Sequence, residues 1–140
     1  MSKENWLAEV SWGGGNVFVG SDDAGHSVVY DSADGVQKGI GPVRVLLTAM
    51  GACSGIDVVS ILKKRRQKVK SLRILLNGER PKHGYPKPWT SIHARYLVSG
   101  DDLDPKYVEE AVRDSVEKYC SVAASLRPTA KITYSYEIVS

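Results

Sequence analysis

The sequence contains only two cysteines, Cys53 and Cys120, among 140 residues, so it is not a disulfide-rich scaffold. A chain of this length buries enough surface on folding to form a core without a disulfide or a metal ion. The three histidines lie in unrelated segments, and no second ligand stands at a short spacing from either cysteine. This lack of ligand spacing argues against a metal site.

The sequence also lacks a strong charge of one sign and a targeting segment. The formal net charge is +3, and the basic residues are concentrated in the run from Lys63 to Lys68, so we expect no nucleic-acid partner. The first ten residues have no basic segment leading into an apolar stretch, as a signal peptide would. No apolar run approaches the roughly 20 residues of a membrane helix, so we expect no membrane contact and a soluble, cytoplasmic protein with normally reduced thiols.

Residues 1–41 contain short β-branched and aromatic segments separated by turns. The alternating segment Trp6–Trp12 is followed by a glycine turn, and the segments Asn16–Val19 and Ser27–Tyr30 are separated by an Asp- and Gly-containing turn. This pattern predicts an N-terminal antiparallel β-meander.

Residues 42–68 have the composition of a buried central helix. Pro42 suits the first turn, because its missing N–H removes no helical hydrogen bond there. Apolar side chains cover almost the whole circumference of the first turns, which predicts burial on nearly every side. The basic run from Lys63 to Lys68 lies where the helix dipole favours cations, so we interpret it as a helix terminus before an interaction patch.

Residues 69–140 contain a strand pair, an amphipathic helix and a final strand. The segments Val69–Glu79 and Trp89–Val98 alternate in polarity and predict two strands, joined by a proline-rich loop. Asp104 and Pro105 supply an N-cap and a first helical residue, so a helix is expected to begin there.

That helix is expected to bury one stripe, formed at spacings of three and four by Val108, Ala111, Val112, Ser115, Val116, Tyr119 and Cys120. A short helix over Ser121–Leu126 and a last strand over Lys131–Val139 follow. The order of elements predicts a single α+β domain over residues 1–140, with helices packed on a mostly antiparallel sheet.

Cys53 and Cys120 both fall on helix faces that are expected to point inward. Their spacing alone favours the simplest interpretation, two inert buried thiols. His26, His83 and His93 lie on strand or loop positions without a marker of a Cys–His nucleophile, and we expect each to face solvent. The spacing leaves redox-active and nucleophilic cysteines open as alternatives.

Each cysteine lies in a distinctive segment. The first segment is Gly41–Lys64, GPVRVLLTAMGACSGIDVVSILKK, and the second is Val116–Leu126, VEKYCSVAASL, followed by the strand from Ile132. The two segments resemble the OsmC/Ohr family, most closely its YhfA-like branch, and the first is similar to the family's central helix. Trp12 and the hairpin after it also fit the opening hairpin of that branch. The resemblance covers nearly the whole chain and places each cysteine in a family context.

The resemblance implies an OsmC-like fold in which mostly antiparallel sheets enclose a buried central helix and two chains intertwine as a homodimer, with the reactive thiols near the subunit interface. It also implies a thiol-dependent peroxidase of oxidative-stress defence, which reduces organic hydroperoxides or hydrogen peroxide. By matching position, Cys53 would be the peroxidatic thiol, forming a sulfenic acid, and Cys120 the resolving thiol, forming a disulfide with it. An external dithiol would reduce that disulfide, and no metal, flavin or haem would be needed.

The sequence departs from the family pattern at the groups that hold the reactive thiolate. Family peroxidases use an arginine from the N-terminal hairpin, braced by a glutamate ahead of the first cysteine. The corresponding positions before Cys53 are Val43 and Arg44, and residues 1–34 contain no arginine. A thiol buried in an apolar helix without a cation has a raised pKa and reacts slowly.

Arg44 is the candidate thiolate-stabilising cation nearest in the sequence. It precedes Cys53 by nine positions, which places it about 13 Å along one helix, so a contact has to come across a dimer interface. Lys38, Arg113 and Arg127 are the other sources. Because the Arg/Glu pair is missing, the alternative hypothesis is a non-enzymatic protein that binds a small hydrophobic or thiol-bearing ligand, or that senses oxidants.

Overall fold

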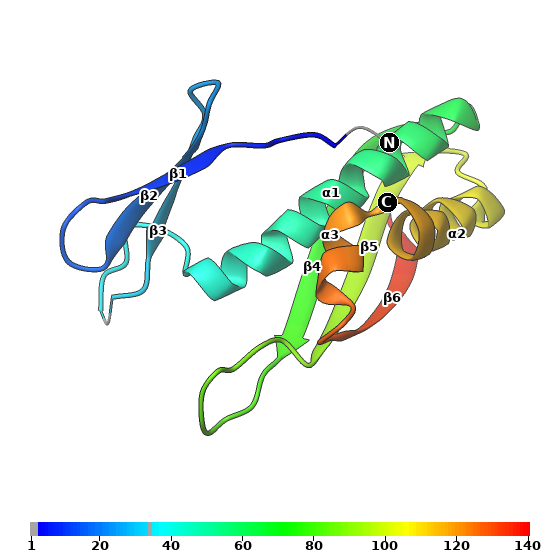
Figure 1. The fold of residues 1–140 in the computed structure, drawn as a ribbon. Coiled ribbons are helices and arrows are strands. Elements are labelled where there is room, and N and C mark those ends of the chain that lie inside the picture. The colour runs from blue at the N-terminus through cyan, green and yellow to red at the C-terminus, as the bar shows by residue number, and fades with distance from the viewer. Residues whose placement is uncertain (1–2, 34) are drawn as a thin grey trace. The chain divides into compact units, whose positions relative to one another are not determined.

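The computed structural model describes residues 3–33 and 35–140, which form two compact units, Met1–Leu46 and Leu47–Ser140. The first unit contains a three-stranded sheet and the start of a long helix. The second contains the rest of that helix, a second three-stranded sheet and the remaining helices (Figure 1).

The N-terminal sheet is the antiparallel meander that the sequence predicts. Strands β1 (Ala8–Trp12), β2 (Val17–Asp22) and β3 (Ser27–Asp31) are hydrogen-bonded in chain order. The turn between β1 and β2 contains Gly14 and Gly15 at φ of 95° and 54°, which glycine adopts without a steric cost.

The long helix α1 (Pro42–Lys64) begins at the predicted residue and ends earlier than the predicted boundary at residue 68. Arg66 has a left-handed backbone with φ of 58°, and the Gln67 N–H donates to the Leu62 carbonyl oxygen (2.9 Å), which closes the helix. Lys68 is already the first residue of strand β4.

By length and composition α1 would also suffice to cross a membrane, contrary to the expectation that no apolar run approaches that length. The core helix of a soluble protein meets the same criterion, and α1 packs Met50, Val58 and Leu62 into the core of the second unit. We therefore interpret α1 as a core helix.

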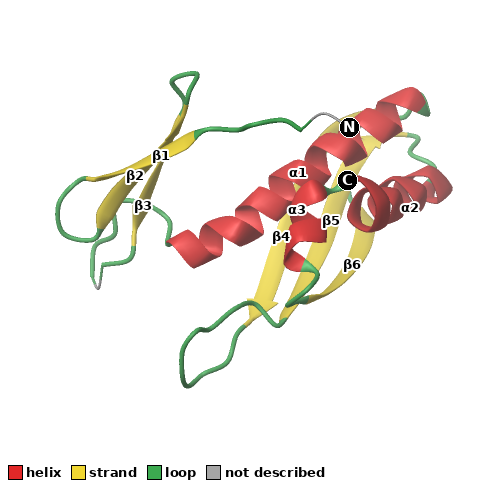
Figure 2. Ribbon diagram, in the orientation of Figure 1, coloured by secondary structure: helices red, strands yellow, loops and turns green. Residues whose placement is uncertain are grey.

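The second sheet has the order β4-β5-β6, formed by β4 (Lys68–Glu79), β5 (Ser91–Asp101) and β6 (Lys131–Ile138). β4 and β5 are antiparallel, whereas β5 and β6 are parallel. The helices of this unit cover one face of its sheet (Figure 2). The predicted α+β class with mostly antiparallel sheets is confirmed.

The core lies between these helices and β5. Side chains of β5 alternate between buried and more accessible positions, and the inward ones are Ile92, Ala94, Tyr96 and Val98. α1 lies close to β4 because Gly51 faces it without a side chain, and a Cβ at Gly51 would stand 2.8 Å from Leu76 Cδ1. A larger residue at this position would push the helix off the sheet.

The helix after β5 is shorter than predicted. α2 (Pro105–Asp114) starts at the expected cap, where the Lys106 N–H donates to the Asp104 side chain (3.0 Å). It then widens into the π-helical turn η1 (Ser115–Tyr119), and α3 (Ser121–Leu126) follows. The prediction that Tyr119 lies on the buried stripe is wrong, because the wider turn rotates it outward and leaves it 52% exposed.

Candidate functional site: two thiols beside a buried hydroxyl network

Cys120 lies between η1 and α3. The prediction that it lies within a helix, on the buried stripe, is therefore wrong. Cys120 is the N-cap of α3, and its sulfur accepts a hydrogen bond from the Ala123 N–H (3.3 Å). Its own N–H donates to the Ser115 carbonyl oxygen (2.8 Å), which closes the π-turn. The side chain is buried, with 3% of the residue exposed.

Cys53 lies on α1 and is partly buried against the same core. The Cys120 thiol donates to the carbonyl oxygen of Met50, one helical turn before Cys53, over 3.8 Å. Both thiols are free and pack in the same core, and the Cys53 thiol is close enough to contribute to the raised pKa of Cys120. The structure thus brings together the two cysteines that the sequence singled out, from elements 67 positions apart in the chain.

The environment of Cys120 favours the protonated thiol. Burial, and less strongly the neighbouring Cys53 thiol, raises the pKa of Cys120 to about 11, whereas the backbone N–H groups of Ala123 and Val122 oppose the shift. Cys120 is therefore almost entirely a neutral thiol near pH 7, and of the two cysteines Cys53 is the more accessible.

A chain of buried hydroxyl groups lies beside the thiol pair. The Ser115 hydroxyl donates to the Ser54 carbonyl oxygen (2.9 Å) and toward Asp57 Oδ2 (3.3 Å), and its oxygen lies 2.8 Å from Ser54 Oγ. Ser54 Oγ lies 2.5 Å from the Tyr96 hydroxyl. Each hydroxyl has one proton, so Tyr96 donates to Ser54, and Ser54 donates to Ser115.

All three hydroxyl residues are fully buried, and only Asp57 reaches the accessible surface. Burial raises the pKa of Tyr96 to about 12, with the hydrogen bond to Ser54 opposing it. The sequence did not predict this network, although Ser54 follows Cys53 directly and Ser115 is the one serine among the predicted stripe positions. Those polar residues at inward positions were the available signal.

Within one chain, no contact joins the candidate cations Arg44, Lys38, Arg113 or Arg127 to either thiol among the described residues. Arg44 is exposed in the first turn of α1, and nine residues of helix put it on the opposite side from Cys53, about 13 Å along the axis. Arg113 pairs with Glu109 and Asp114 (3.4 Å each).

Arg127 donates to the Val116 carbonyl oxygen (2.7 Å), and Lys38 belongs to the N-terminal unit. The expected source of a cation for Cys53 in a second copy of the chain therefore stays a prediction.

The histidines form no site with the cysteines. His26 is exposed and bonds to Asp22 Oδ2 (2.8 Å), as expected for a solvent-facing residue. The ring of His93 is half-buried and lies 2.7 Å from Thr133 Oγ1 and 3.0 Å from Ser135 Oγ. Among residues 3–33 and 35–140, no three His, Cys, Asp or Glu side chains gather as metal ligands would.

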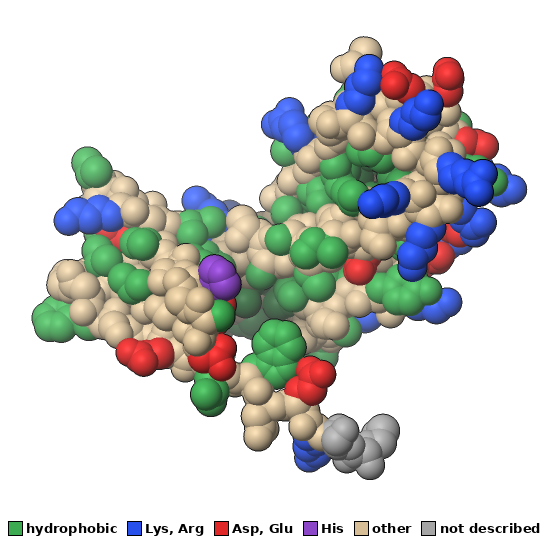
Figure 3. Space-filling model, turned by 90° about the horizontal axis from the view of Figure 1, so that it is seen from above, with side chains coloured by type: hydrophobic (Ala, Val, Ile, Leu, Met, Phe, Trp, Pro, Cys, Tyr) green, Lys and Arg blue, Asp and Glu red, His purple; other side chains and the backbone are tan. Residues whose placement is uncertain are grey.

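The face of α1 that is turned away from the core lines an open groove of about 1020 Å³ against β4. Its apolar lining includes Ala52, Gly55 and Ile56 from α1 and Leu72, Ile74 and Leu76 from β4. Ile56 is 71% exposed and Val59 is 44% exposed. The prediction that this helix is buried on nearly every side is therefore wrong within one chain. Figure 3 shows hydrophobic side chains exposed across one face of the molecule and basic side chains gathered at one side of that face.

The fold and the site define an α+β protein in which an apolar helix and a π-turn bring two free thiols together. The chain belongs to the OsmC-like protein family, whose family model matches residues 35–135 and so includes both thiols. It is 42% identical to protein YhfA of Escherichia coli over 95% of this chain and 98% of that protein.

Solved structures agree with this assignment. A hypothetical protein from Aquifex aeolicus has a TM-score of 0.86 and 34% identity, covering 98% of each chain. The organic hydroperoxide resistance protein OhrB of Bacillus subtilis has a TM-score of 0.64 and 17% identity, covering 96% of this chain and 98% of its own. At that identity, the likeness to OhrB concerns the fold.

Proposed function

We propose that this chain is a cytoplasmic thiol-dependent peroxidase that reduces organic hydroperoxides, or hydrogen peroxide, in defence against oxidative stress. The observation that carries the proposal is the packing of two free thiols, Cys53 and Cys120, in one core beside a buried hydroxyl network, with the Cys120 sulfur 3.8 Å from the Met50 carbonyl oxygen on the Cys53 helix. Membership of a family that includes organic hydroperoxide resistance proteins supports the substrate class.

In the first step, the Cys53 thiolate attacks the terminal oxygen of the hydroperoxide. The O–O bond breaks, the alkoxide takes a proton and leaves as an alcohol, and the Cys53 sulfur is oxidised to a sulfenic acid. In the second step, the Cys120 sulfur attacks the Cys53 sulfur, the S–O bond breaks, and water leaves with the thiol proton. An external dithiol then reduces the disulfide and is itself oxidised.

The roles of the two thiols follow from their environments. Cys53 is partly accessible, so a small peroxide reaches it, whereas Cys120 is buried and has a pKa of about 11, so it is a poor first nucleophile. A buried resolving thiol still reacts because it faces the sulfenic acid directly and does not have to be brought there by diffusion. The cycle uses no metal or organic cofactor.

The active form is a homodimer with its sites near the interface, since members of this family are often dimers. A second copy covers the exposed apolar face of α1, where Ile56 and Val59 would otherwise stay in water. The second copy also supplies the cation that the Cys53 thiolate needs, and its Arg44 is the first candidate.

Intact mass of the fully reduced protein, measured before and after one equivalent of cumene hydroperoxide, tests the cycle. We expect the loss of two hydrogens and a Cys53–Cys120 peptide in the digest. Cys120→Ser should stop at a sulfenic acid that dimedone traps, whereas Cys53→Ser should consume no peroxide. Peroxide consumption that survives Cys53→Ser would show that this mechanism is wrong.

The alternative is a non-enzymatic protein that binds a small hydrophobic or thiol-bearing ligand, or that senses oxidants. It is favoured by the open apolar groove of about 1020 Å³ and by Arg113 and Arg127, which are engaged away from Cys53. An unchanged mass after minutes with peroxide, with both thiols intact, would support this alternative. Native mass spectrometry of the protein as purified would then detect a retained ligand.

A further inference from the structure

The hydroxyl network connects α1 to the residue that holds Cys120. The Ser115 side chain bonds to Ser54 and toward Asp57 on α1, while the Ser115 carbonyl oxygen accepts the Cys120 N–H over 2.8 Å. One residue therefore contacts the Cys53 helix through its side chain and Cys120 through its backbone. The second link between these elements is the Cys120 thiol on the Met50 carbonyl oxygen.

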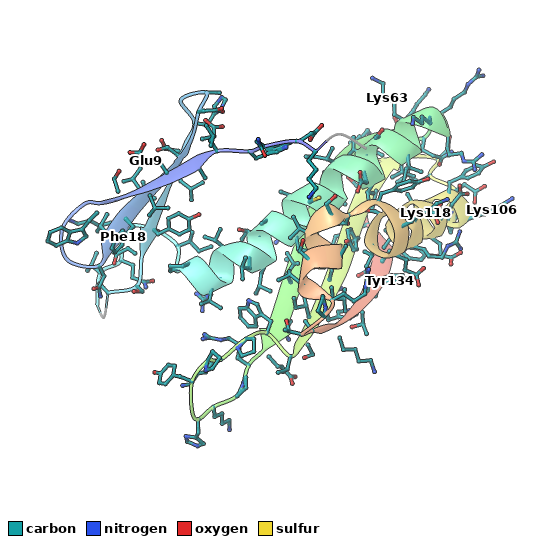
Figure 4. The ribbon with its side chains drawn as sticks, in the orientation of Figure 1. Glu9, Phe18, Lys63, Lys106, Lys118 and Tyr134 are labelled. Carbon is teal, nitrogen blue, oxygen red and sulfur yellow. The ribbon has the colours of Figure 1, made fainter. Side chains whose placement is uncertain are left out.

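The π-turn makes this double contact possible. In a regular α-helix, residues five positions apart, such as Ser115 and Cys120, point about 140° away from each other. The wider turn brings both residues toward α1 and sends Lys118 and Tyr119 outward, where the Lys118 ammonium lies 5.3 Å from the Tyr119 ring centre (Figure 4 labels Lys118). Single π-turns inside helices are frequent at functional sites.

Helix packing alone does not require this network. Val58 and Leu62 on α1 and Val108 and Val112 on α2 already supply an apolar core, and a buried hydroxyl is costly unless every member of its network is paired. Here every buried side-chain nitrogen and oxygen of the described residues has a partner. A fully paired network allows only one relative position of the elements it joins, because hydrogen bonds depend on distance and angle. Apolar contacts alone specify that position less tightly.

We propose that Ser54, Ser115 and Tyr96 are positioning residues that hold Cys120 against α1 at the distance and angle needed for a disulfide with Cys53. Ser115 is the central member because its side chain bonds to Ser54 and its carbonyl oxygen accepts the Cys120 N–H. Ser54 fixes its side chain, and Tyr96 fixes Ser54 from β5. The inference rests on the proposed pairing of the two cysteines and does not require peroxide to be the oxidant.

Equilibrium with a glutathione redox buffer tests this inference separately from the peroxidase activity. Oxidised glutathione converts the two thiols into a disulfide and yields two reduced glutathiones, so the equilibrium constant reports the effective concentration of one thiol at the other. Full-length protein is equilibrated, quenched with acid and analysed by mass. Inertness to peroxide with a normal glutathione equilibrium would reject the peroxidase alone.

Ser115→Ala is expected to lower this equilibrium constant about tenfold, the equivalent of one hydrogen bond lost from the oxidised arrangement. Ser54→Ala should behave similarly if Ser115→Ala does not fold. Tyr96→Phe keeps the ring and removes only the hydroxyl that contacts Ser54 and not Ser115. Its effect should therefore be smaller than that of Ser115→Ala.

Val108→Ala is the matched control, because it removes buried volume from the same core and no hydroxyl. It should leave the constant unchanged. A constant that stays at the wild-type value in Ser115→Ala, or that falls equally in Val108→Ala, would overturn the inference. So would a wild-type protein in which glutathione forms no Cys53–Cys120 disulfide.

Discussion

The two faces of α1 are equally apolar in sequence and have different surroundings. The face with Met50, Val58 and Leu62 is sealed against the sheet and α2, and it includes the hydroxyl of Ser54. The face with Ala52, Ile56 and Val59 lines an open groove. Composition alone therefore identifies a helix that needs cover on all sides, whereas the packing partner of each face depends on the rest of the fold.

The largest expected difference between the faces is in stability. Leu62→Ala removes a fully buried side chain and should lower the free energy of unfolding by about 3 kcal/mol. Val59→Ala, on the groove face, should cost less than about 1 kcal/mol in dilute protein. Urea unfolding of both variants measures this contrast. Equal losses would mean that the groove face is buried in solution as deeply as the core face.

A charge on the groove face tests what covers it. Ile56→Glu leaves the core of one chain untouched, since Ile56 is 71% exposed, but it would place a carboxylate in the proposed dimer interface. We expect the variant to be folded by circular dichroism and to sediment as a monomer, where the wild type sediments as a dimer. Glu79→Gln, at the end of β4, is the control and should not change the mass in solution. An unchanged dimer in Ile56→Glu would place the interface elsewhere.

Alkaline pH distinguishes the sealed face from the open one through Cys120 and Tyr96. Their pKa values are raised, from 9.0 to about 11 and from 10.0 to about 12. The unfolded chain loses these protons first as pH rises, so stability is complete below about pH 9 and is lost as pH increases through the folded pKa values. Each group contributes a slope of about 1.4 kcal/mol per pH unit within its own window.

Urea unfolding from about pH 8 to about pH 11 measures this slope. Cys120→Ser should remove the part that begins near pH 9 and retain the part that begins near pH 10, which belongs to Tyr96. A wild-type stability that stays flat over this range would mean that Cys120 and Tyr96 are both more solvated than their exposed fractions of 3% and 0% imply.

Local signals in the sequence were sufficient for most elements and insufficient for the site. Asp104 and Pro105 predict the start of α2 because a cap acts through its nearest neighbours. The π-turn was not predicted, because the 3.6-residue period assumes a regular helix, whereas η1 is closed by the Cys120 N–H on Ser115 and fixed by Ser54 from a distant element. Helical spacing thus predicted the burial of Cys120 correctly, but it assigned the residue to the preceding helix instead of the N-cap of α3.

The charged end of α1 provides the smallest test of what holds the helix. Arg65 donates to Glu110 of α2 over 2.6 Å, and the two side chains are partly exposed, so water and salt screen the pair. Glu110→Gln should change the free energy of unfolding by less than Val59→Ala does, and added salt should reduce the difference further. A loss comparable with that of Leu62→Ala would mean that this ion pair, and not the buried face, fixes α1 against α2. The short bond would then be part of the framework that keeps Cys53 opposite Cys120, and Glu110→Gln would also shift the glutathione equilibrium.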